Sequence, residues 1–393
     1  MTLKAQLHRD ESLVPGLDNR TLDAILAREA SAWDAVLRTP FLRAEKLSAM
    51  TGCDLWIKYE NLQHTGAFKE RGALSKLLNL SSEERTRGVV AASAGNHAQG
   101  LARHATLLGV SATIVMPLMT PYVKVEQTER LGARVILRGD DFDDANAHAQ
   151  KICADEGRIY VHPFDDPYVI AGQGTIAAEM LDDQPDLDII LAPIGGGGLL
   201  SGIATAARRR GSSCSIIGVQ AQLYPSMFNA LRDESRPVGG STLAEGIAVR
   251  EPGAITRQIV DALADDILLV DERALERALS LYLNVQKVLA EGAGAAGLAA
   301  ILEHPERFKG KKVGTVICGG NIDTRLLSSI LMRDLVRQGR IARLRIELID
   351  VPGQLTKVSE IIAGAGANVI DVAYHKIFSD LPAKQTYIDI SVE

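Results

Sequence analysis

The sequence has few cysteines for its length of 393 residues. Cys53, Cys153, Cys214 and Cys318 show no CxxC spacing. So few thiols in so long a chain exclude a disulfide-stapled scaffold and fit a reducing compartment, so we expect a cytoplasmic protein. The opening stretch, MTLKAQLHRDES, contains no apolar run. The sequence therefore predicts no secretory signal.

An excess of positive charge is also absent. The chain has 43 Lys and Arg against 49 Asp and Glu, a net charge of -6. That balance argues against nucleic acid or an anionic membrane as the main partner. With 46% hydrophobic residues the chain is neither disordered nor fibrous, and its length predicts two or three folded units.

One uncharged stretch, residues 189–207, is long enough to suggest a membrane-spanning helix. However, Pro193 and four consecutive glycines lie in its middle, and both residue types are poor helix formers. We therefore expect a buried strand, a glycine loop and the start of a helix, and no membrane partner.

Short β-rich runs alternate with helical patterns along most of the chain. Several of the runs are apolar on both faces, which is typical of parallel strands covered by helices. The fold class predicted is α/β with parallel-rich sheets. The expected strands are 88–92, 112–116, 134–138, 188–192, 216–220, 267–270 and 312–318, and the expected helices include 99–108, 122–131 and 274–291.

The character of the sequence changes near residue 337. From residue 341 the pattern predicts a strand, a Pro-Gly turn, a helix and two further strands, ending at residue 393. This order indicates a separate small α+β module. We therefore expect a catalytic domain over 1–335, with a smaller subdomain of roughly 55–160 inserted in it, and a second domain over 341–393.

The first motif is ENLQHTGAFKERGA, residues 60–73, in which a helix is expected to begin near Ala67. Lys69 then lies in the first turn, where the helix dipole disfavours a cation. A lysine in that position has a reason to lose its proton, and a neutral amine can form a Schiff base. On position alone, however, an ordinary surface lysine is the favoured interpretation.

The second motif, Ser93-Ala94-Gly95-Asn96-His97-Ala98-Gln99-Gly100, follows a predicted strand. Small residues at a helix start let backbone N–H groups point at an anion such as a carboxylate. Asn96 adds an amide suited to a hydroxyl or phenolate oxygen. A tight strand-to-helix turn capped by Ser93 is the structural alternative, and His97 alone is more often a structural histidine.

The third motif places four glycines between a predicted strand and a predicted helix, PIGGGGLLSG at residues 193–202. Four glycines cost backbone entropy unless the backbone must approach something closely. A phosphate at the helix N-terminus is the expected reason. No GK[ST] follows, so this is not a Walker loop.

Two further glycine motifs differ in meaning. Residues 292–297, GAGAAG, match GxGxxG, but a helix is predicted before them, so the pattern does not indicate a dinucleotide site. Residues 316–322 contain CGGN, where Cys318 ends a predicted strand. Ligands bind at that end of strands in α/β folds, although a buried small thiol is the plainer interpretation. No spacing in the sequence signals a metal site.

Together, these motifs resemble those of the fold-type II pyridoxal-phosphate enzymes, and within them the threonine dehydratases (threonine ammonia-lyases). The matching stretches are ENLQHTGAFKERGA, ASAGNHAQG, GGGGLLSG and CGGN, in that order, within residues 40–325. The stretch DVPGQL through GANV, residues 350–369, resembles an ACT domain, a small amino-acid-sensing module.

The resemblance implies roles for individual residues, with pyridoxal 5'-phosphate as cofactor. Lys69 would carry the cofactor covalently and act as catalytic base, Phe68 would pack against the ring, and Asn96 would contact its 3'-oxygen. Cys318 would lie beside the pyridine nitrogen. The phosphate would be held by Gly195, Gly196, Gly197, Gly198 and Leu199, and the substrate carboxylate by Ser93, Ala94, Gly95 and His97.

The implied reaction is loss of water and ammonia from L-threonine to give 2-oxobutanoate, and from L-serine to give pyruvate. A serine or 3-hydroxyaspartate dehydratase is an alternative of the same class. A non-catalytic amino-acid sensor is an alternative of another class, which intact Lys69 disfavours, and a nicotinamide oxidoreductase is weakened by the misplaced GxGxxG.

Two departures from the family pattern matter. Serine racemases of this fold carry a second serine where this chain has Ala94, so racemisation is disfavoured. An ACT domain runs βαββαβ, and the pattern here stops after three strands, so the module is expected to be incomplete. The resemblance also implies a homo-oligomer, dimer or tetramer, and isoleucine or valine as a possible effector.

Overall fold

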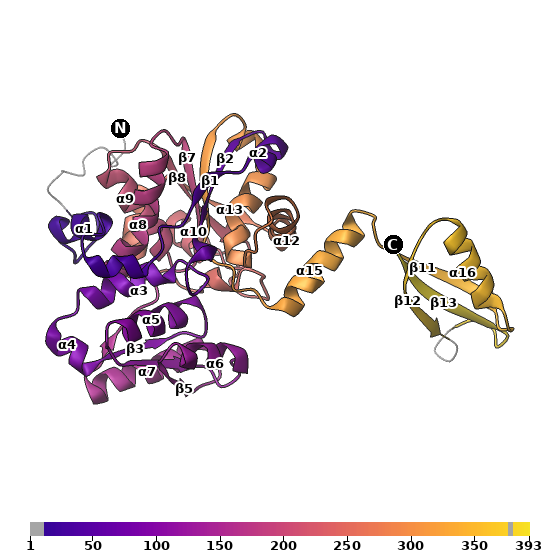
Figure 1. Cartoon of the computed structure of the whole chain (residues 1–393), viewed down its shortest axis with the longest axis horizontal. Helices are drawn as coiled ribbons and strands as arrows, with labels where there is room; N and C mark the ends of the chain where they lie inside the picture. Colours follow the sequence, from indigo (N-terminus) through magenta and orange to yellow (C-terminus); the bar gives the residue numbers. More distant parts are fainter. Residues whose placement is uncertain (1–11, 376–379) are drawn as a thin grey trace. The chain divides into compact units, whose positions relative to one another are not determined.

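The structure is a computed structural model that describes residues 12–375 and 380–393. The opening stretch, in which the sequence predicts no secretory signal, lies almost wholly in residues 1–11, outside the described residues. The chain divides into two compact units, Met1–Ile322 and Asp323–Glu393 (Figure 1). Each unit is described by itself.

The larger sheet of the first unit has six strands in the order β1-β2-β10-β7-β8-β9. Their bounds are β1 Phe41–Arg43, β2 Asp54–Tyr59, β7 Ile189–Pro193, β8 Ser215–Ala221, β9 Asp266–Val270 and β10 Lys312–Ile317. All neighbours are parallel except the edge pair β1 and β2. Parallel strands bring their carboxyl ends to one edge of the sheet, where ligands bind in such folds.

The smaller sheet of the same unit has four parallel strands in the order β5-β4-β3-β6. They are β3 Val89–Ala92, β4 Ala112–Met116, β5 Arg134–Leu137 and β6 Ile159–Tyr160. Along β3, Val89 and Ala91 pack with α5 (Asn96–Leu107), whereas Val90 and Ala92 pack with α7 (Phe142–Glu156). Both faces are therefore covered, which is why the strand is apolar throughout.

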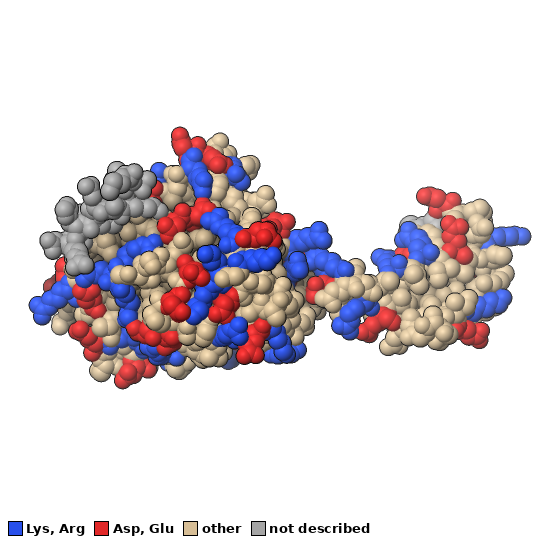
Figure 2. All heavy atoms as spheres, turned by 90° about the horizontal axis from the view of Figure 1, so that it is seen from above, with Lys and Arg blue, Asp and Glu red and all other residues tan. Residues whose placement is uncertain are grey.

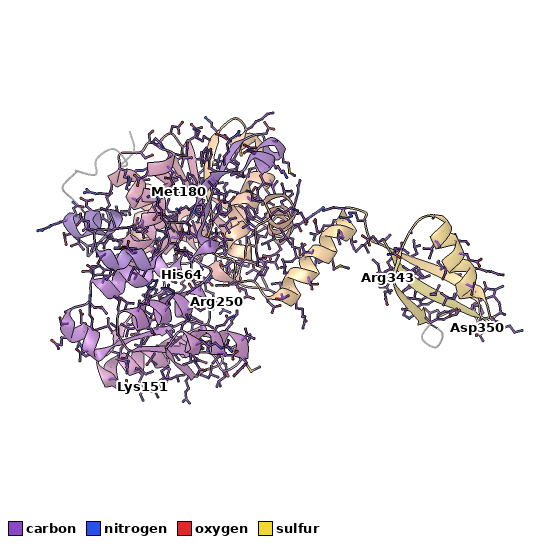
Figure 3. All side chains as sticks on the ribbon, in the orientation of Figure 1. His64, Lys151, Met180, Arg250, Arg343 and Asp350 are labelled. Atoms are coloured by element: carbon purple, nitrogen blue, oxygen red, sulfur yellow. The ribbon has the colours of Figure 1, made fainter. Side chains whose placement is uncertain are left out.

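The remaining helices of the first unit surround these two sheets. Their bounds are α1 Asn19–Leu26, α2 Glu45–Thr51, α3 Lys69–Leu78, α4 Ser82–Arg87, α6 Tyr122–Arg130, α8 Pro167–Asp183, α9 Gly198–Arg209, α10 Ser226–Arg232, α11 Ala254–Leu263, α12 Glu272–Leu281, α13 Gly292–Glu303 and α14 Pro305–Phe308. Figure 3 labels Lys151 on α7 and Met180 on α8, and Met180 lies against β10 at Gly314. The predicted α/β architecture with parallel-rich sheets is confirmed.

The structure differs from the sequence prediction at the end of α12 and agrees with it over residues 189–207. The helix expected over 274–291 ends at Leu281 and continues only as a π-helical turn, Tyr282–Gln286. Lys287 then takes a left-handed conformation with φ 61°, which stops the helix. The uncharged stretch 189–207 is strand β7, the glycine loop and most of α9. Within residues 12–375 and 380–393, no helix has the length and apolar character needed to cross a membrane.

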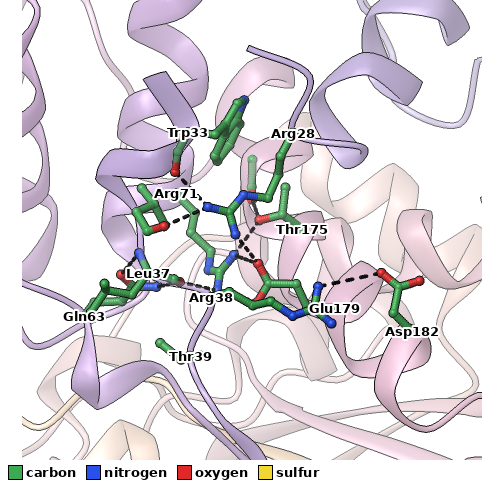
Figure 4. A network of polar contacts seen from close by, with 12 residues as sticks. Arg28, Trp33, Leu37, Arg38, Thr39, Gln63, Arg71, Thr175, Glu179 and Asp182 are labelled. Atoms are coloured by element: carbon green, nitrogen blue, oxygen red, sulfur yellow. Dashed lines mark hydrogen bonds and ion pairs between the residues drawn. The ribbon is translucent and has the colours of Figure 1, made fainter. Parts of the chain in front are cut away.

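A buried network of ion pairs connects α3 with β2 and α8 (Figure 4). Arg71 of α3 is fully buried and donates from Nε to Glu60 Oε2 at 2.8 Å and from Nη1 to Glu179 Oε1 at 2.7 Å. Lys58 of β2 donates to Glu179 Oε2 at 2.6 Å, and Arg28 to Glu179 Oε1 at 2.7 Å. Burial alone raises the pKa of Glu179, but Arg71 and Lys58 lower it to about 2.

The second unit contains α15 (Thr324–Arg337) and a three-stranded antiparallel sheet in the order β11-β13-β12. The elements are β11 Ala342–Ile349, α16 Gln354–Gly364, β12 Val369–His375 and β13 Gln385–Val392. Val358 and Ile362 of α16 pack on Ile388 and Ile390 of β13. The predicted order of strand, helix, strand, strand is confirmed.

The surface of the first unit mixes charges of both signs. On the face shown in Figure 2, Lys and Arg side chains are interspersed with Asp and Glu side chains.

In the second unit, Asp389 is buried within the sheet and pairs with Arg343 and Arg345. Figure 3 labels Arg343 at this sheet.

Replacing Glu179 with Gln should destabilise the first unit strongly. The change leaves Arg71 and Lys58 buried without their shared counter-charge, and breaking a buried ion pair costs about 3–5 kcal/mol. Denaturant unfolding followed by circular dichroism measures the free energy of unfolding. The control is Asp183→Asn on the same helix, which removes the partly exposed pair with Arg38 and should cost less than about 1 kcal/mol. Equal losses for the two variants would contradict this account of the network.

Candidate active site

The start of α3 is fixed to the carboxyl end of β10. Phe68 precedes the helix, and its N–H donates to the carbonyl of Cys318 at 3.0 Å. Gly320 N–H donates back to the carbonyl of Gly66 at 2.9 Å. These two bonds place Lys69, the first residue of α3, beside the end of the central strand. The prediction that a helix begins here with Lys69 in its first turn is confirmed.

The amine of Lys69 lies in a confined setting beside Pro163 and Phe68. Nζ donates to the carbonyl of Pro163 at 2.7 Å and lies 5.1 Å from the ring centroid of Phe68. Burial lowers the pKa of Lys69 to about 8, against the opposing influence of Cys318 and Glu291. Near neutral pH an appreciable fraction of this amine is therefore unprotonated, which is the form that attacks a carbonyl group.

The glycine loop forms a cradle of backbone donors at the start of α9. Gly197 has φ 102°, a conformation that favours glycine, and α9 begins at Gly198. Within residues 12–375 and 380–393, the backbone N–H groups of 195–199 have no hydrogen-bond acceptor. Residues 196–199 are buried. Buried donors without acceptors at a helix N-terminus suit an anion such as a phosphate.

Neighbouring side chains hold this loop in shape. Thr256 Oγ1 donates to the carbonyl of Gly196 at 2.6 Å, which orients the peptide between Gly196 and Gly197. A Cβ at Gly196 would collide with the ring of Phe164, and one at Gly197 would lie 2.7 Å from Thr256 Cβ. Glycine is therefore needed at these positions for packing.

Pro163 and Phe164 connect the lysine to the glycine loop. The carbonyl of Pro163 accepts the hydrogen bond from Lys69, and the next side chain, Phe164, packs against Gly196 and Gly198. The ring of His162 meets the ring of Phe164 edge-on, with centroids 4.6 Å apart. The segment 163–164 therefore contacts both the amine of Lys69 and the glycine loop.

The turn after β3 leads into α5, as the second motif predicts. The N–H of Ser93 donates to Val115 O at 3.1 Å, and Ser93 Oγ accepts from Gly95 N at 3.3 Å. Ala94 and Gly95 are half-buried, and a Cβ at Gly95 would meet no atom within 4 Å. The turn therefore leaves open space beside the helix start. Asn96 is the first residue of α5.

His97 has the environment of a structural histidine. Its ring is buried, and Nε2 lies 2.9 Å from the carbonyl of Val161. Burial and the neighbouring Lys69 lower the pKa of His97 to about 3. The ring is therefore neutral at physiological pH, while its Nδ1 is buried with no hydrogen-bond partner among the described residues.

Cys318 lies immediately after β10 and is buried. Burial raises the pKa of its thiol, and the nearby Glu291 raises it further. The group is therefore a neutral thiol at physiological pH. The four cysteines are free in the structure, as the sequence predicts.

Two residues that were given no role in the sequence analysis form a polar chain with Asn96. Asn96 Nδ2 donates to Glu291 Oε1 at 2.9 Å and to Oε2 at 3.1 Å. Asn321 Nδ2 donates to Asn96 Oδ1 and to the carbonyl of Thr65, each at 2.8 Å. Burial raises the pKa of Glu291 to about 7. In the sequence, the only sign of a role for Glu291 was its place directly before the GAGAAG run.

The GAGAAG run lies at the start of helix α13, and no strand leads directly into it. A Cβ at Gly297 would collide with the hydroxyl of Thr315 on β10. Small residues here therefore let the helix pack closely on the sheet. The prediction that this motif is not a dinucleotide site agrees with that packing.

Comparison with known proteins places the chain among enzymes of one cofactor class. Residues 32–319 match the family model described as pyridoxal-phosphate dependent enzyme. The L-threonine ammonia-lyase of Thermotoga maritima is 44% identical over 375 residues, which cover 95% of this chain and 93% of the relative.

Two solved structures are similar to this chain over most of its length. The processed form of threonine deaminase isoform 2 from Solanum lycopersicum has a TM-score of 0.76 at 34% identity, and the match covers 85% of this chain and 94% of that chain. Maize serine racemase has a TM-score of 0.73 at 32% identity, with 81% of this chain and 98% of that chain covered.

Proposed function

The chain belongs to the family of pyridoxal-phosphate dependent enzymes, and we propose that within this family it is a lyase that deaminates L-threonine to 2-oxobutanoate and ammonia. L-serine, which differs from threonine by one methyl group, is proposed as a second substrate giving pyruvate. The observation that carries the proposal is the amine of Lys69, with a lowered pKa, in one site with a buried and acceptor-free anion cradle.

The residues of the site fit pyridoxal 5'-phosphate. The unpaired N–H groups of residues 195–199 suit its phosphate, and Lys69 suits its aldehyde. The neutral thiol of Cys318 suits the ring nitrogen, and the ring of Phe68 lies beside the lysine amine. The two carboxylate oxygens of Glu291 can share one N–H of Asn96 Nδ2, which leaves the second N–H for a ring oxygen.

The bound cofactor would act as an electron sink for the pair left behind when a proton leaves the substrate α-carbon. Lys69 then takes that proton on Nζ, which is why a pKa of about 8 suits the base better than that of an ordinary lysine. The carbonyl of Pro163 orients the amine. The neutral thiol of Cys318 would lie beside the ring nitrogen and would not stabilise a proton there as a carboxylate would, which suits loss of the β-hydroxyl group.

The substrate carboxylate is proposed to bind at the turn formed by Ser93, Ala94, Gly95 and His97. The N–H groups of Asn96, His97 and Ala98 have no acceptor within the described parts of the chain, 12–375 and 380–393. Together with the open space at Gly95, they make an anion site at the start of α5. Ala94 carries no hydroxyl that would return a proton to the opposite face, so elimination is favoured over racemisation.

Residues 341–393 of the second unit are proposed to be an ACT-like regulatory module that binds isoleucine or valine. Its support is the order of elements and the antiparallel sheet β11-β13-β12 packed on one side by α16. A homo-oligomer, dimer or tetramer, is part of the same proposal, since such modules sense ligands between paired copies.

A cytoplasmic location is proposed from the four free thiols.

Lys69→Ala should abolish formation of 2-oxo acid from L-threonine while the fold persists. The variant lacks both the covalent attachment point and the base. Production of 2-oxobutanoate is the measured quantity, and circular dichroism reports the fold. Lys46→Ala, on the exposed surface of α2, is the control and should retain wild-type activity. Substantial turnover by the Lys69 variant would overturn the assignment.

Removing residues from Arg340 onward should leave threonine deamination intact, because every residue of the site lies before Ile322. If isoleucine or valine shifts substrate affinity of the complete chain, by roughly 5–150-fold for typical allosteric coupling, the shift should vanish on deletion. Inhibition curves for the two proteins measure this. A response that persists without the second unit would place the effector site in the first unit.

A further inference from the structure

The side-chain amide of Asn96 is held from both of its ends. Its oxygen accepts a hydrogen bond from Asn321 Nδ2 at 2.8 Å, and its nitrogen donates to both carboxylate oxygens of Glu291. Turning the amide over would bring its oxygen against the Glu291 carboxylate and its NH₂ against the NH₂ of Asn321. Both contacts would then be repulsive, so only one orientation is compatible with its neighbours.

Glu291 is itself fixed by the backbone around it. Its N–H donates to the carbonyl of Gly319 at 2.9 Å, and it is the residue directly before helix α13. A Cβ at Gly319 would lie 2.6 Å from Glu291 Oε1, and one at Gly246 would lie 3.3 Å from the same oxygen. The carboxylate thus occupies space that two glycines leave free, which accounts for the glycine after Cys318.

We propose that Glu291 is a positioning residue for cofactor binding: with Asn321 it holds the Asn96 amide so that the remaining Nδ2–H faces the cofactor. This inference rests on the proposed function, in which Asn96 contacts a ring oxygen of pyridoxal 5'-phosphate. The carboxylate needs no contact of its own with the cofactor. It acts by accepting one hydrogen of the amide and thereby directing the other.

The test is a double-mutant cycle on the dissociation constant of pyridoxal 5'-phosphate, measured by absorbance titration of the apoprotein. Glu291→Ala should raise the dissociation constant about tenfold, since a hydrogen bond to a charged group is lost. In the Asn96→Ala background the same change should have less than about a twofold effect, because the amide on which Glu291 acts is gone. Equal factors in the two backgrounds would overturn the proposal.

A conservative variant separates positioning from general packing. The side-chain oxygen of Gln accepts a hydrogen bond from Asn96, so Glu291→Gln should stay within about threefold of wild type. Loss equal to that of Glu291→Ala would contradict the hydrogen-bonding role. Glu303→Ala, at the other end of α13, is the matched control and should leave the dissociation constant unchanged. Circular dichroism of each apoprotein verifies folding.

The wild-type titration separates this inference from the proposed function. A wild-type chain that binds no pyridoxal 5'-phosphate would overturn the proposed function and this inference with it. Binding by the wild type, together with independent effects of Glu291 and Asn96, would overturn this inference alone. Binding with strongly coupled effects supports both.

Discussion

The buried ion pairs of Arg71 are the constraint on which the site depends. Glu60 and Glu179 hold the guanidinium from two sides, and Arg71 lies two residues after Lys69 on the same helix. A buried charge with fixed partners tolerates little movement, because displacement leaves it unpaired. The network therefore fixes where α3 begins, while the hydrogen bonds between residues 66–68 and the end of β10 fix the same point from the other side.

The position of α3 determines the surroundings of the Lys69 amine. Confinement beside Phe68 and Pro163 lowers the pKa of Lys69, and the same Pro163–Phe164 segment forms a wall of the glycine cradle. A base and an anion site so arranged serve a ligand that has both an aldehyde and a phosphate. Asn96, Glu291 and Asn321 form a chain of directed hydrogen bonds at the start of α5.

The sequence predicts those parts of the site that are continuous in the chain. The four glycines after β7 and the turn at Ser93 each combine a strand end with a helix start, and Lys69 lies at a helix start after Gly66. The role of Lys69 came from the resemblance to pyridoxal-phosphate enzymes, because its position alone favours an ordinary surface lysine. Glu291, Pro163 and Phe164 were missed because their roles arise from contacts between distant segments: Glu291 meets Asn96 across 195 positions. The sequence prediction also made α12 too long. The left-handed conformation after it occurs at Lys287, whereas the residue that usually marks such a helix end is a glycine.

The most direct test of this account is reduction of the purified protein with borohydride, followed by peptide mapping with mass spectrometry. Borohydride fixes pyridoxal 5'-phosphate irreversibly to the amine that carries it. The account predicts loss of the yellow colour and a pyridoxyl phosphate group on the peptide that contains Lys69. A cofactor attached to a different lysine, or no attached cofactor in a protein that deaminates threonine, would contradict it.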